Sequence, residues 1–402
     1  MDRQTVSDTE KLKAIREQMP ATTAVHYLNT GTNGPLPKVA VDVMQKEIEK
    51  EFTQGRYLPF IKELNADMDT VRNCLSEMLG ASYEEIALTQ STTEGVNIVL
   101  WGLRWKPGDE VITTGVEHPA GLAPLALIKS RYGIVVKYVD VEYGDKYDES
   151  KFLSDIEQLI TGRTRLLLIS HVSFSTGLTF PLKKITDLCH ANDVYVLVDG
   201  AQGAGAIPVD LHKLGVDFYA FTGRKWFCGP EGVGALYVSR KRISEVDPTF
   251  ISPSSIRDRH DLDIQSPYVI PAPFAARYHI ATAMNKPLLL GFQQALKYIQ
   301  EEVGIDWITT RIPRLARYAR KLIGSLPGIE LITPQGKEAG FVHFQVKGWE
   351  PQHLCGLLNE KKFMIRPVPK PHLPMPARIS TGFYNTEEEL ELLSEALSEL
   401  VN

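Results

Sequence analysis

A lysine and an arginine stand between an apolar run and a glycine-rich segment in the stretch FTGRKWFCGPEGVG, residues 221–234. Lysine side chains usually keep their charge in water and bury only their methylene stems. A lysine in a pocket beside a second cation instead has a lowered pKa, and its neutral amine is a nucleophile. Lys225, with Arg224 beside it, is therefore the first candidate for chemistry, and the rest of the chain decides between these two interpretations.

Polar residues also follow other apolar runs of the sequence. Thr92 and Thr93 lie in STTEG, a pattern typical of a helix start, which is either a plain cap or a phosphate site built from free backbone N–H groups. His118 follows the run DEVITT, where its ring can stack on a flat cofactor or carry a proton. Thr222 and Arg224 follow DFYAF, and an arginine can bind phosphate through two hydrogen bonds.

Asp199 ends the apolar run VYVLV. A carboxylate at such a place is costly unless a cation pairs with it. It is either a turn-forming aspartate or the partner of a protonated ring nitrogen. Ala201 and Gln202 follow, a small residue that allows a ring to approach and an amide donor.

Each pattern alone has an ordinary structural explanation, but the set predicts one cofactor. A phosphate clamp, an aspartate for a pyridinium, a stacking histidine and a lysine for a Schiff base are what pyridoxal 5′-phosphate (PLP) requires. The sequence contains neither GxGxxG nor GxxxxGK[ST], which argues against the usual nucleotide sites.

The elements that must position these residues form an α/β pattern. Seven short apolar, β-branched runs alternate with helix-like stretches from about residue 63 to 240, which predicts a mainly parallel seven-stranded sheet covered on both faces. Function collects at the carboxyl ends of such strands. Two long helices are expected within 274–325, followed by a smaller α+β C-terminal domain. The expected division is an N-terminal segment 1–60 packing on the small domain and pocket, a large PLP-binding domain 61–285, and a helical connection with the small domain, 286–402.

The bulk composition excludes several classes of protein. The 402 residues are 43% hydrophobic with a net charge of −5, enough for a large core and without a basic block for nucleic acid. No apolar run is long enough for a membrane span, and the polar N-terminus does not resemble a signal peptide, so a cytoplasmic location is expected. The four cysteines are scattered and the histidines lack metal-ligand spacing, so we expect reduced thiols and no metal.

Five motifs together resemble the fold-type I PLP enzymes of aminotransferase class V: STTEGVN, GVEHPAG, LVDGAQGAG, FTGRKWFCGPEGVGALYV and RISTGFYNTEEEL. They span residues 90 to 390. The resemblance implies that Lys225 forms the Schiff base, Asp199 faces the pyridinium and His118 stacks on the ring. It further implies that Gln202 binds the ring oxygen and that the phosphate is bound by Thr92, Thr93, Thr222 and Arg224. Many members of the family have histidine at the position of Arg224.

The resemblance also implies a substrate pocket and a homodimer. Thr282 resembles the residue that reaches the phosphate from a partner subunit, which implies shared active sites. The segment 27–37, which contains Asn33, resembles the loop that lines the substrate pocket. Arg378 matches the arginine that binds the substrate α-carboxylate.

Within class V, the shared stretches are most similar to cystine/cysteine C–S lyases. That group has a second arginine about a dozen residues before the carboxylate-binding one, and Arg366 fits this position, although a surface or salt-bridged role suits it equally. Two arginines suit the two carboxylates of cystine. The loop 366–378 contains no cysteine, which weakens the desulfurase interpretation. Phe174 and Ser175 stand where relatives usually have an asparagine near the cofactor oxygen.

The sequence thus predicts a PLP-dependent lyase that eliminates the β-sulfur substituent of an amino acid, giving pyruvate, ammonia and a sulfur product. An epimerase or an aminotransferase remains an alternative because both use the same Cα carbanion, and a desulfurase is a weaker one. A third alternative is a PLP-fold protein without catalytic activity, and the presence of Lys225, Asp199 and Arg378 argues against it.

Overall fold

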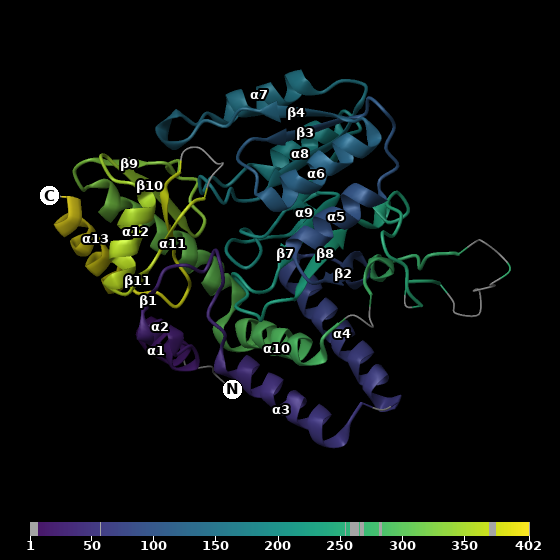
Figure 1. Ribbon diagram of the computed structural model, residues 1–402, viewed down its shortest axis with the longest axis horizontal. Coiled ribbons are helices and arrows are strands. Elements are labelled where there is room, and N and C mark those ends of the chain that lie inside the picture. Colours follow the sequence, from purple (N-terminus) through teal and green to yellow (C-terminus); the bar gives the residue numbers. More distant parts are fainter. Residues whose placement is uncertain are drawn as a thin grey trace.

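A seven-stranded sheet forms the centre of the computed structural model, which describes residues 7–56, 58–253, 255–257, 265, 269–280, 284–369 and 375–401 (Figure 1). The strand order is β2-β8-β7-β6-β5-β3-β4, and only β8 runs against the others. The strands are β2 (Ile86–Thr89), β3 (Glu110–Thr114), β4 (Val135–Val139), β5 (Thr164–Ser170), β6 (Tyr195–Asp199), β7 (Phe218–Thr222) and β8 (Gly234–Val238).

Helices bury both faces of this sheet, which explains why its strands are apolar almost throughout. In β5, Leu166 and Leu168 pack on one side while Leu167 and Ile169 pack on the other. The first side is covered by α5 (Thr92–Gly102) and α6 (Pro119–Tyr132). The second side is covered by α4 (Leu58–Leu79), α7 (Glu149–Leu159), α8 (Leu182–His190) and the short α9 (Leu211–Leu214).

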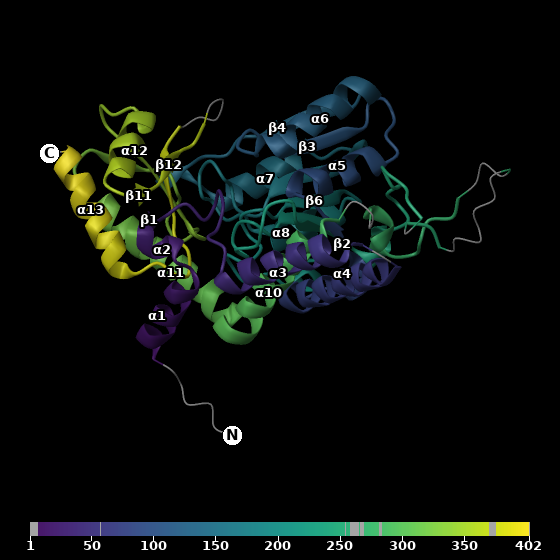
Figure 2. The same ribbon diagram turned by 60° about the horizontal axis from the view of Figure 1, so that its bottom comes forward.

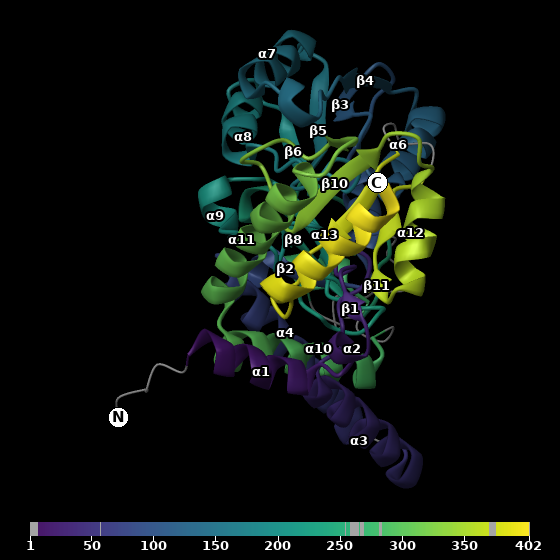
Figure 3. The same ribbon diagram turned by 90° about the vertical axis from the view of Figure 1, so that its left-hand side faces the viewer.

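A smaller antiparallel sheet follows in the chain, with the order β12-β13-β10-β9. Its strands are β9 (Ile329–Leu331), β10 (Phe341–Val346), β12 (Arg366–Pro367) and β13 (Ala377–Ser380). Three helices pack with it around a core of its own, and Figure 3 shows them from that side: α11 (Ile305–Gly324), α12 (Pro351–Glu360) and α13 (Glu387–Val401).

The N-terminal segment contacts both parts of the molecule. Strand β1 (His26–Tyr27) pairs with β11 (Phe363–Met364), while α3 (Lys38–Gln54) packs against α10 (Lys286–Lys297). Figure 2 shows α1 (Asp8–Gln18) and α2 (Ala21–Ala24) beside the small sheet's helices, and α3 beside α4 and α10. The segment therefore bridges the two sheets.

The structure confirms the predicted fold class and each of the seven predicted strands. The helical stretch expected within 274–325 begins later than the apolar pattern indicated. A 3-10 turn occupies Ala275–Tyr278, and α10 starts only at Lys286. A π turn, Tyr298–Val303, then joins α10 to α11. Further 3-10 turns lie at Tyr83–Glu85, Gly144–Lys146 and Arg240–Arg242.

The domain boundaries at residues 60 and 285 stay a proposal, supported by the starts of α4 and α10 close to them. No helix among the described residues is both long and apolar enough to cross a membrane. The same residues contain no group of side chains suited to hold a metal ion. All four cysteines are buried and free, and Cys355 lies in the small-domain core.

Candidate active site

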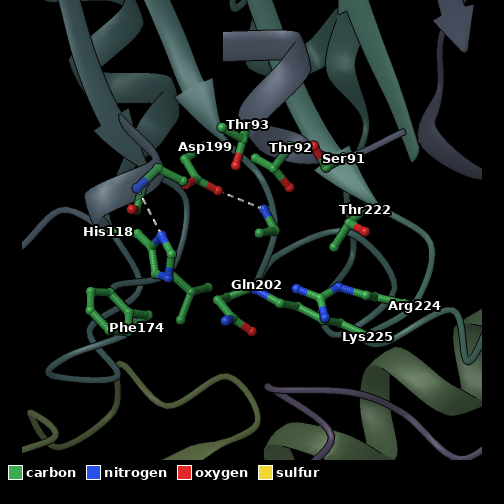
Figure 4. A pocket seen from close by; sticks show the side chains of 14 residues that line it. Ser91, Thr92, Thr93, His118, Phe174, Asp199, Gln202, Thr222, Arg224 and Lys225 are labelled. Atoms are coloured by element: carbon green, nitrogen blue, oxygen red, sulfur yellow. Dashed lines mark hydrogen bonds between the residues drawn. The ribbon is translucent and has the colours of Figure 1, made fainter. Parts of the chain in front are cut away.

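The carboxyl ends of the parallel strands surround a cavity with an empty volume of about 500 Å³, open solvent at its mouth included. Residues after β2, β3, β5, β6 and β7 all reach it, because parallel strands end at the same edge of a sheet. Figure 4 shows His118 and Phe174 on one side and Thr222 and Arg224 on the other. The lining residues are Ser91, Thr92, Thr93, His118, Ala120, Ser170, Val172, Phe174, Asp199, Ala201, Gln202, Thr222, Arg224 and Lys225.

Lys225 is buried, with 9% of its surface exposed. Burial lowers the pKa of its amine to about 8, and the positive charges of Arg378 and Arg224 act in the same direction, while Asp199 opposes them. A substantial fraction of this amine is therefore neutral near pH 8, which is the nucleophilic form. The N-terminal segment packs closely on the backbone here, since a Cβ on Gly34 would lie 2.2 Å from the Lys225 carbonyl oxygen.

Asp199 presents a buried carboxylate at the end of β6. Its oxygen Oδ1 accepts a hydrogen bond from the Ala201 backbone at 3.0 Å. Burial raises the pKa of Asp199, and the Lys225 charge and the Ala201 N–H counteract that rise. Among the described residues, no cation forms an ion pair with it. A buried carboxylate in this state is stabilised by a cationic ligand.

The His118 ring forms part of the cavity wall together with Phe174. His118 caps α6, and its Nδ1 accepts a hydrogen bond from the Ala120 N–H at 3.0 Å, so the proton of the neutral ring is on Nε2. The Phe174 ring meets it edge to face, with centroids 4.6 Å apart. The Phe174 ring thus packs against the His118 ring on this side of the cavity.

Gln202 is held in one orientation by two partners. The indole N–H of Trp226, which can only donate, binds its Oε1 at 2.9 Å. Its Nε2 donates to the Gly31 carbonyl at 3.0 Å. The amide is therefore fixed in one flip state, with one further N–H available on Nε2.

The far end of the cavity has the features of an anion site. Ser91 caps α5, whose first backbone N–H groups lack acceptors within the helix. The buried hydroxyl of Thr92 has no hydrogen-bond partner within the described residues, which is costly for a polar group unless a ligand binds it. The Thr222 hydroxyl donates to the Val233 carbonyl at 3.2 Å and can still accept.

Arg224 lies at the edge of this site, and its guanidinium group already has two partners within the chain. Its Nη1 donates to Asn33 Oδ1 at 2.7 Å and lies 3.3 Å from Glu231 Oε1. The structure thus places Asn33 against Arg224 and joins the N-terminal segment to the cavity. The substrate contact predicted for Asn33 from the sequence stays a prediction.

Arg366 and Arg378 form a pair of cations on the neighbouring sheet. They lie opposite each other on the paired strands β12 and β13. Both guanidinium groups donate to Thr32 Oγ1, that of Arg366 at 3.3 Å and that of Arg378 at 2.8 Å. Like charges in this arrangement are destabilising. No carboxylate of the described chain pairs with either arginine, and Arg378 Nε is buried without a partner. Burial, and then the Arg366 charge, lower the pKa of Arg378 to about 9.

The residues present fit PLP at three points. The Thr92 hydroxyl and the α5 N-terminus offer donors to a phosphate, Asp199 offers a carboxylate to a protonated pyridine nitrogen, and Lys225 offers an amine to an aldehyde. The Arg366–Arg378 pair lies outside this cavity but acts on Lys225 electrostatically, and it offers an anion site for a substrate.

Nine of the predicted site residues line one cavity: Thr92, Thr93, His118, Asp199, Ala201, Gln202, Thr222, Arg224 and Lys225. Asn33, Arg366 and Arg378 lie in adjoining segments, while Thr282 lies outside the described residues. Their detailed roles stay predictions.

Sequence reasoning did not single out Glu117, which lies behind the cavity. Its carboxyl accepts hydrogen bonds from Thr114 and Ser170, and burial raises its pKa to about 7. It also missed Thr32, which both arginines share. The position of Glu117, directly before His118 in a buried stretch, could have indicated its importance. No local sequence pattern indicated Thr32.

Comparison with known proteins gives one family. The model of the family "Aminotransferase class-V" matches residues 26–393. A probable cysteine desulfurase of Methanothermobacter thermautotrophicus is 27% identical, with 96% of this chain and 97% of that protein covered. A probable cysteine desulfurase of Mycolicibacterium paratuberculosis is 33% identical over 82% of this chain, and the match spans about half, 48%, of that longer protein.

Solved structures agree with this result. The cystine C–S lyase C-DES, in complex with its reaction product cysteine persulfide, superposes with a TM-score of 0.85 at 29% identity, covering 95% of this chain and 99% of that one. A C-DES variant with glycine covalently linked to the PLP cofactor gives 0.87 at 28% identity, covering 96% and 99%. The cysteine desulfurase of Thermococcus onnurineus in its apo form gives 0.86 at 26% identity, covering 97% and 98%.

Proposed function

The chain belongs to the aminotransferase class-V family of PLP-dependent enzymes, and on this premise we propose that it cleaves the carbon–sulfur bond of cystine or a related sulfur amino acid. The observation that carries the proposal is the pair of arginines, Arg366 and Arg378, which have no carboxylate partner among the described residues and lie next to the Lys225 cavity. Two cations at one site suit a substrate with two carboxylates.

Lys225 acts as the base in this proposal. When bound, PLP withdraws electrons from Cα of the amino acid, so that a proton and then a β-substituent can leave. The Lys225 amine, whose pKa is about 8, takes the Cα proton at Nζ and can return it. Arg378 favours the neutral amine that this step requires, because its charge disfavours a second cation.

Three other residues hold the cofactor in place for this chemistry. Asp199 stabilises a proton at the pyridine nitrogen by charge pairing in a buried site. His118 offers a flat ring on one side, with its tautomer fixed by Ala120. The hydroxyl of Thr92 at the α5 N-terminus donates to the phosphate. We propose these roles, together with Gln202 at the ring oxygen, from the positions described above.

The proposed products are pyruvate, ammonia and a sulfur compound that keeps the second half of the substrate. The named relatives include cysteine desulfurases, so sulfur transfer is the alternative. The loop from Arg366 to Arg378 contains no cysteine to accept sulfur. Cys355 is buried in α12, and burial raises its thiol pKa, which suits a core residue better than a nucleophile.

Product analysis tests this proposal directly. Purified holoprotein is incubated with cystine, with cysteine and with a panel of other amino acids, and pyruvate, sulfide and absorbance are followed. We expect pyruvate from cystine. Alanine as product would favour a desulfurase, a racemised substrate an epimerase, and a keto acid with the amino form of the cofactor an aminotransferase. Absence of pyruvate with every sulfur amino acid contradicts the lyase assignment.

Replacement of Lys225 tests the cofactor site separately. We expect Lys225→Ala to remove the visible absorbance band of PLP bound as a Schiff base, because no other lysine lines the cavity within the described residues. Absorbance spectra of wild type and variant, both loaded with PLP, provide the measurement. Lys213→Ala, on an exposed side chain, is the control and should leave the band unchanged. An unaltered band in Lys225→Ala would falsify the central assignment.

The proposal includes a homodimer with shared active sites. An apolar groove along α3 supports it, with an empty volume of about 1660 Å³ and the exposed side chains of Ile48 and Phe52. The groove also reaches Asn285 and Pro287, directly after the segment that contains Thr282. We propose that a second copy of the chain covers this groove.

A further inference from the structure

Strand β10 presents two different faces. Val342, Phe344 and Val346 pack into the core of the small domain. Phe341 points the other way and belongs to the core of the large domain, where it meets Trp226 edge to face. Since side chains alternate along a strand, His343 shares the face of Phe341 and lies at the junction of the two domains.

His343 is fully buried and makes two hydrogen bonds, one of which crosses this junction. Its Nε2 lies 3.0 Å from the carbonyl oxygen of Phe174, which can only accept, so Nε2 carries the proton. Its Nδ1 lies 3.3 Å from Thr333 Oγ1, which donates to it. Burial, and then the charge of Arg378, hold the pKa of His343 well below its usual value, so the ring is neutral with one fixed tautomer.

The partner of His343 belongs to the loop between β5 and α8, which carries Phe174. This loop is closely fitted to the small domain: Gly177 has a φ of +75°, and a Cβ there would lie 2.8 Å from His343 Nδ1. On its other side, Ser175 donates to the Val116 carbonyl at 3.1 Å, two residues before His118. Phe174 itself packs edge to face on His118 (Figure 4).

A continuous set of contacts thus joins the substrate side to the cofactor side. Arg378, on β13, is the residue directly opposite His343 on β10. His343 holds the Phe174 backbone, and the Phe174 ring lies against His118. Neither His343 nor Phe174 is needed for the roles proposed above, and a buried neutral histidine beside an arginine is not explained by packing alone.

We propose that His343 is a positioning residue that fixes the Phe174–His118 wall of the PLP cavity from the small domain. By holding the Phe174 carbonyl, it sets the angle and distance at which Phe174 supports the His118 ring. It does not touch substrate or cofactor. The inference rests on the proposed place of His118 beside the cofactor, whereas the contacts themselves can be measured independently of that role.

The test compares variants with and without a side-chain N–H at position 343. His343→Phe removes the donor and keeps an aromatic ring, whereas His343→Val removes the donor with a smaller side chain that cannot overpack the site. If one variant fails to fold, the other still tests the hydrogen bond. His343→Gln keeps a side-chain N–H and is the rescue variant. Phe344→Leu, on the same strand but facing the small-domain core, is the matched control for loss of stability.

Two measurements report on position rather than on activity. Hydrogen–deuterium exchange of the segment 171–180, in protein with and without PLP, should be at least about tenfold faster in the two apolar variants, because the loop loses its anchor. The visible circular dichroism of bound PLP should also change in them, since the ring beside it is less well held. His343→Gln and Phe344→Leu should resemble wild type in both.

Steady-state kinetics add a third readout. We expect kcat of His343→Phe to fall about 10- to 100-fold, because a small displacement near the reacting groups has effects of this size, while KM changes less than about threefold, because Arg378 still binds the carboxylate. A raised KM with unchanged kcat would show that His343 serves Arg378 instead, and unchanged exchange in the apolar variants would refute the anchor. A spectral change of equal size in Phe344→Leu would assign the effect to general destabilisation. If Lys225→Ala kept the absorbance band, the proposed function would be wrong. A faster loop exchange in the His343 variants would still show that His343 anchors the loop.

Discussion

At the residue scale, the site contains more buried positive charge than the chain neutralises. Lys225 and Arg378 are buried, Arg366 lies beside Arg378, and Asp199 is the carboxylate whose charge acts on Lys225. Uncompensated buried charges destabilise a fold by several kcal/mol each unless a ligand pairs with them. The arrangement therefore implies anionic ligands, which a phosphate and an amino-acid carboxylate provide.

The lowered pKa of Lys225 predicts unusual reactivity toward acylating reagents. In protein freed of PLP, the neutral amine increases as pH rises through about 8, so the labelling rate of Lys225 should reach half its maximum near pH 8. Exposed lysines should do so near pH 10.4, the usual value. Competitive labelling across pH, read by mass spectrometry of the peptides, provides the measurement. A Lys225 profile that follows the exposed lysines contradicts the buried, low-pKa amine.

The two arginines should have separable effects on substrate binding. Arg366→Gln should raise KM for cystine about tenfold or more, the effect of losing one charge-assisted hydrogen bond, and leave KM for cysteine nearly unchanged. Arg378→Gln should raise KM for both, because each substrate has an α-carboxylate. Arg314→Gln, on an exposed face of α11, is the control. Equal effects of Arg366→Gln on both substrates would argue against a second carboxylate site.

At the element scale, the loop between β5 and α8 depends on a close approach to β10. Gly177 makes this possible because it adopts a φ of +75° and leaves room for Thr333 and His343. The sheet alone would not bring these segments together, since residues 174 and 343 are 169 positions apart in the chain. The cavity wall at Phe174 is therefore held from behind by the small domain.

Gly177→Ala should destabilise the protein by about 1–3 kcal/mol, because alanine is strained at this φ and its Cβ would lie 2.6 Å from Thr333 Oγ1. Urea unfolding of the holoprotein measures the change. Gly162→Ala, where no atom lies within 4 Å of the added Cβ, should change stability by less than about 0.5 kcal/mol. Similar midpoints for the two variants would mean that the close contact has no energetic role.

At the scale of the whole molecule, the groove along α3 leaves apolar surface in water. Phe52 is 83% exposed and Ile48 57%. Contiguous exposed apolar surface marks an interaction site more often than a solvent face. The proposed dimer would cover this surface.

Phe52→Asp should therefore shift the protein from dimer to monomer and lower activity with it, because a charge in an apolar interface is strongly unfavourable. Sedimentation velocity at several concentrations measures the mass. Leu392→Asp, on an exposed position of α13 far from the groove, should remain dimeric. A wild-type protein that sediments as a monomer at every concentration would overturn the dimer proposal.

The sequence alone determined the cofactor and the fold class. Both depend on local patterns: apolar runs predict strands, and the residues directly after Thr89, Thr114, Asp199 and Thr222 reach the same edge because parallel strands end together. For this reason nine predicted residues could be assigned to one cavity before their distances were known.

The tertiary structure decided what no local pattern encodes. Asn33 meets Arg224 across 191 residues, Arg366 lies opposite Arg378, and His343 reaches the loop of Phe174. Each of these contacts depends on how the two sheets and the N-terminal segment pack together. Packing is set by the sum of many long-range contacts rather than by the residues next to each side chain in the chain, so only the folded molecule shows which polar groups share a partner.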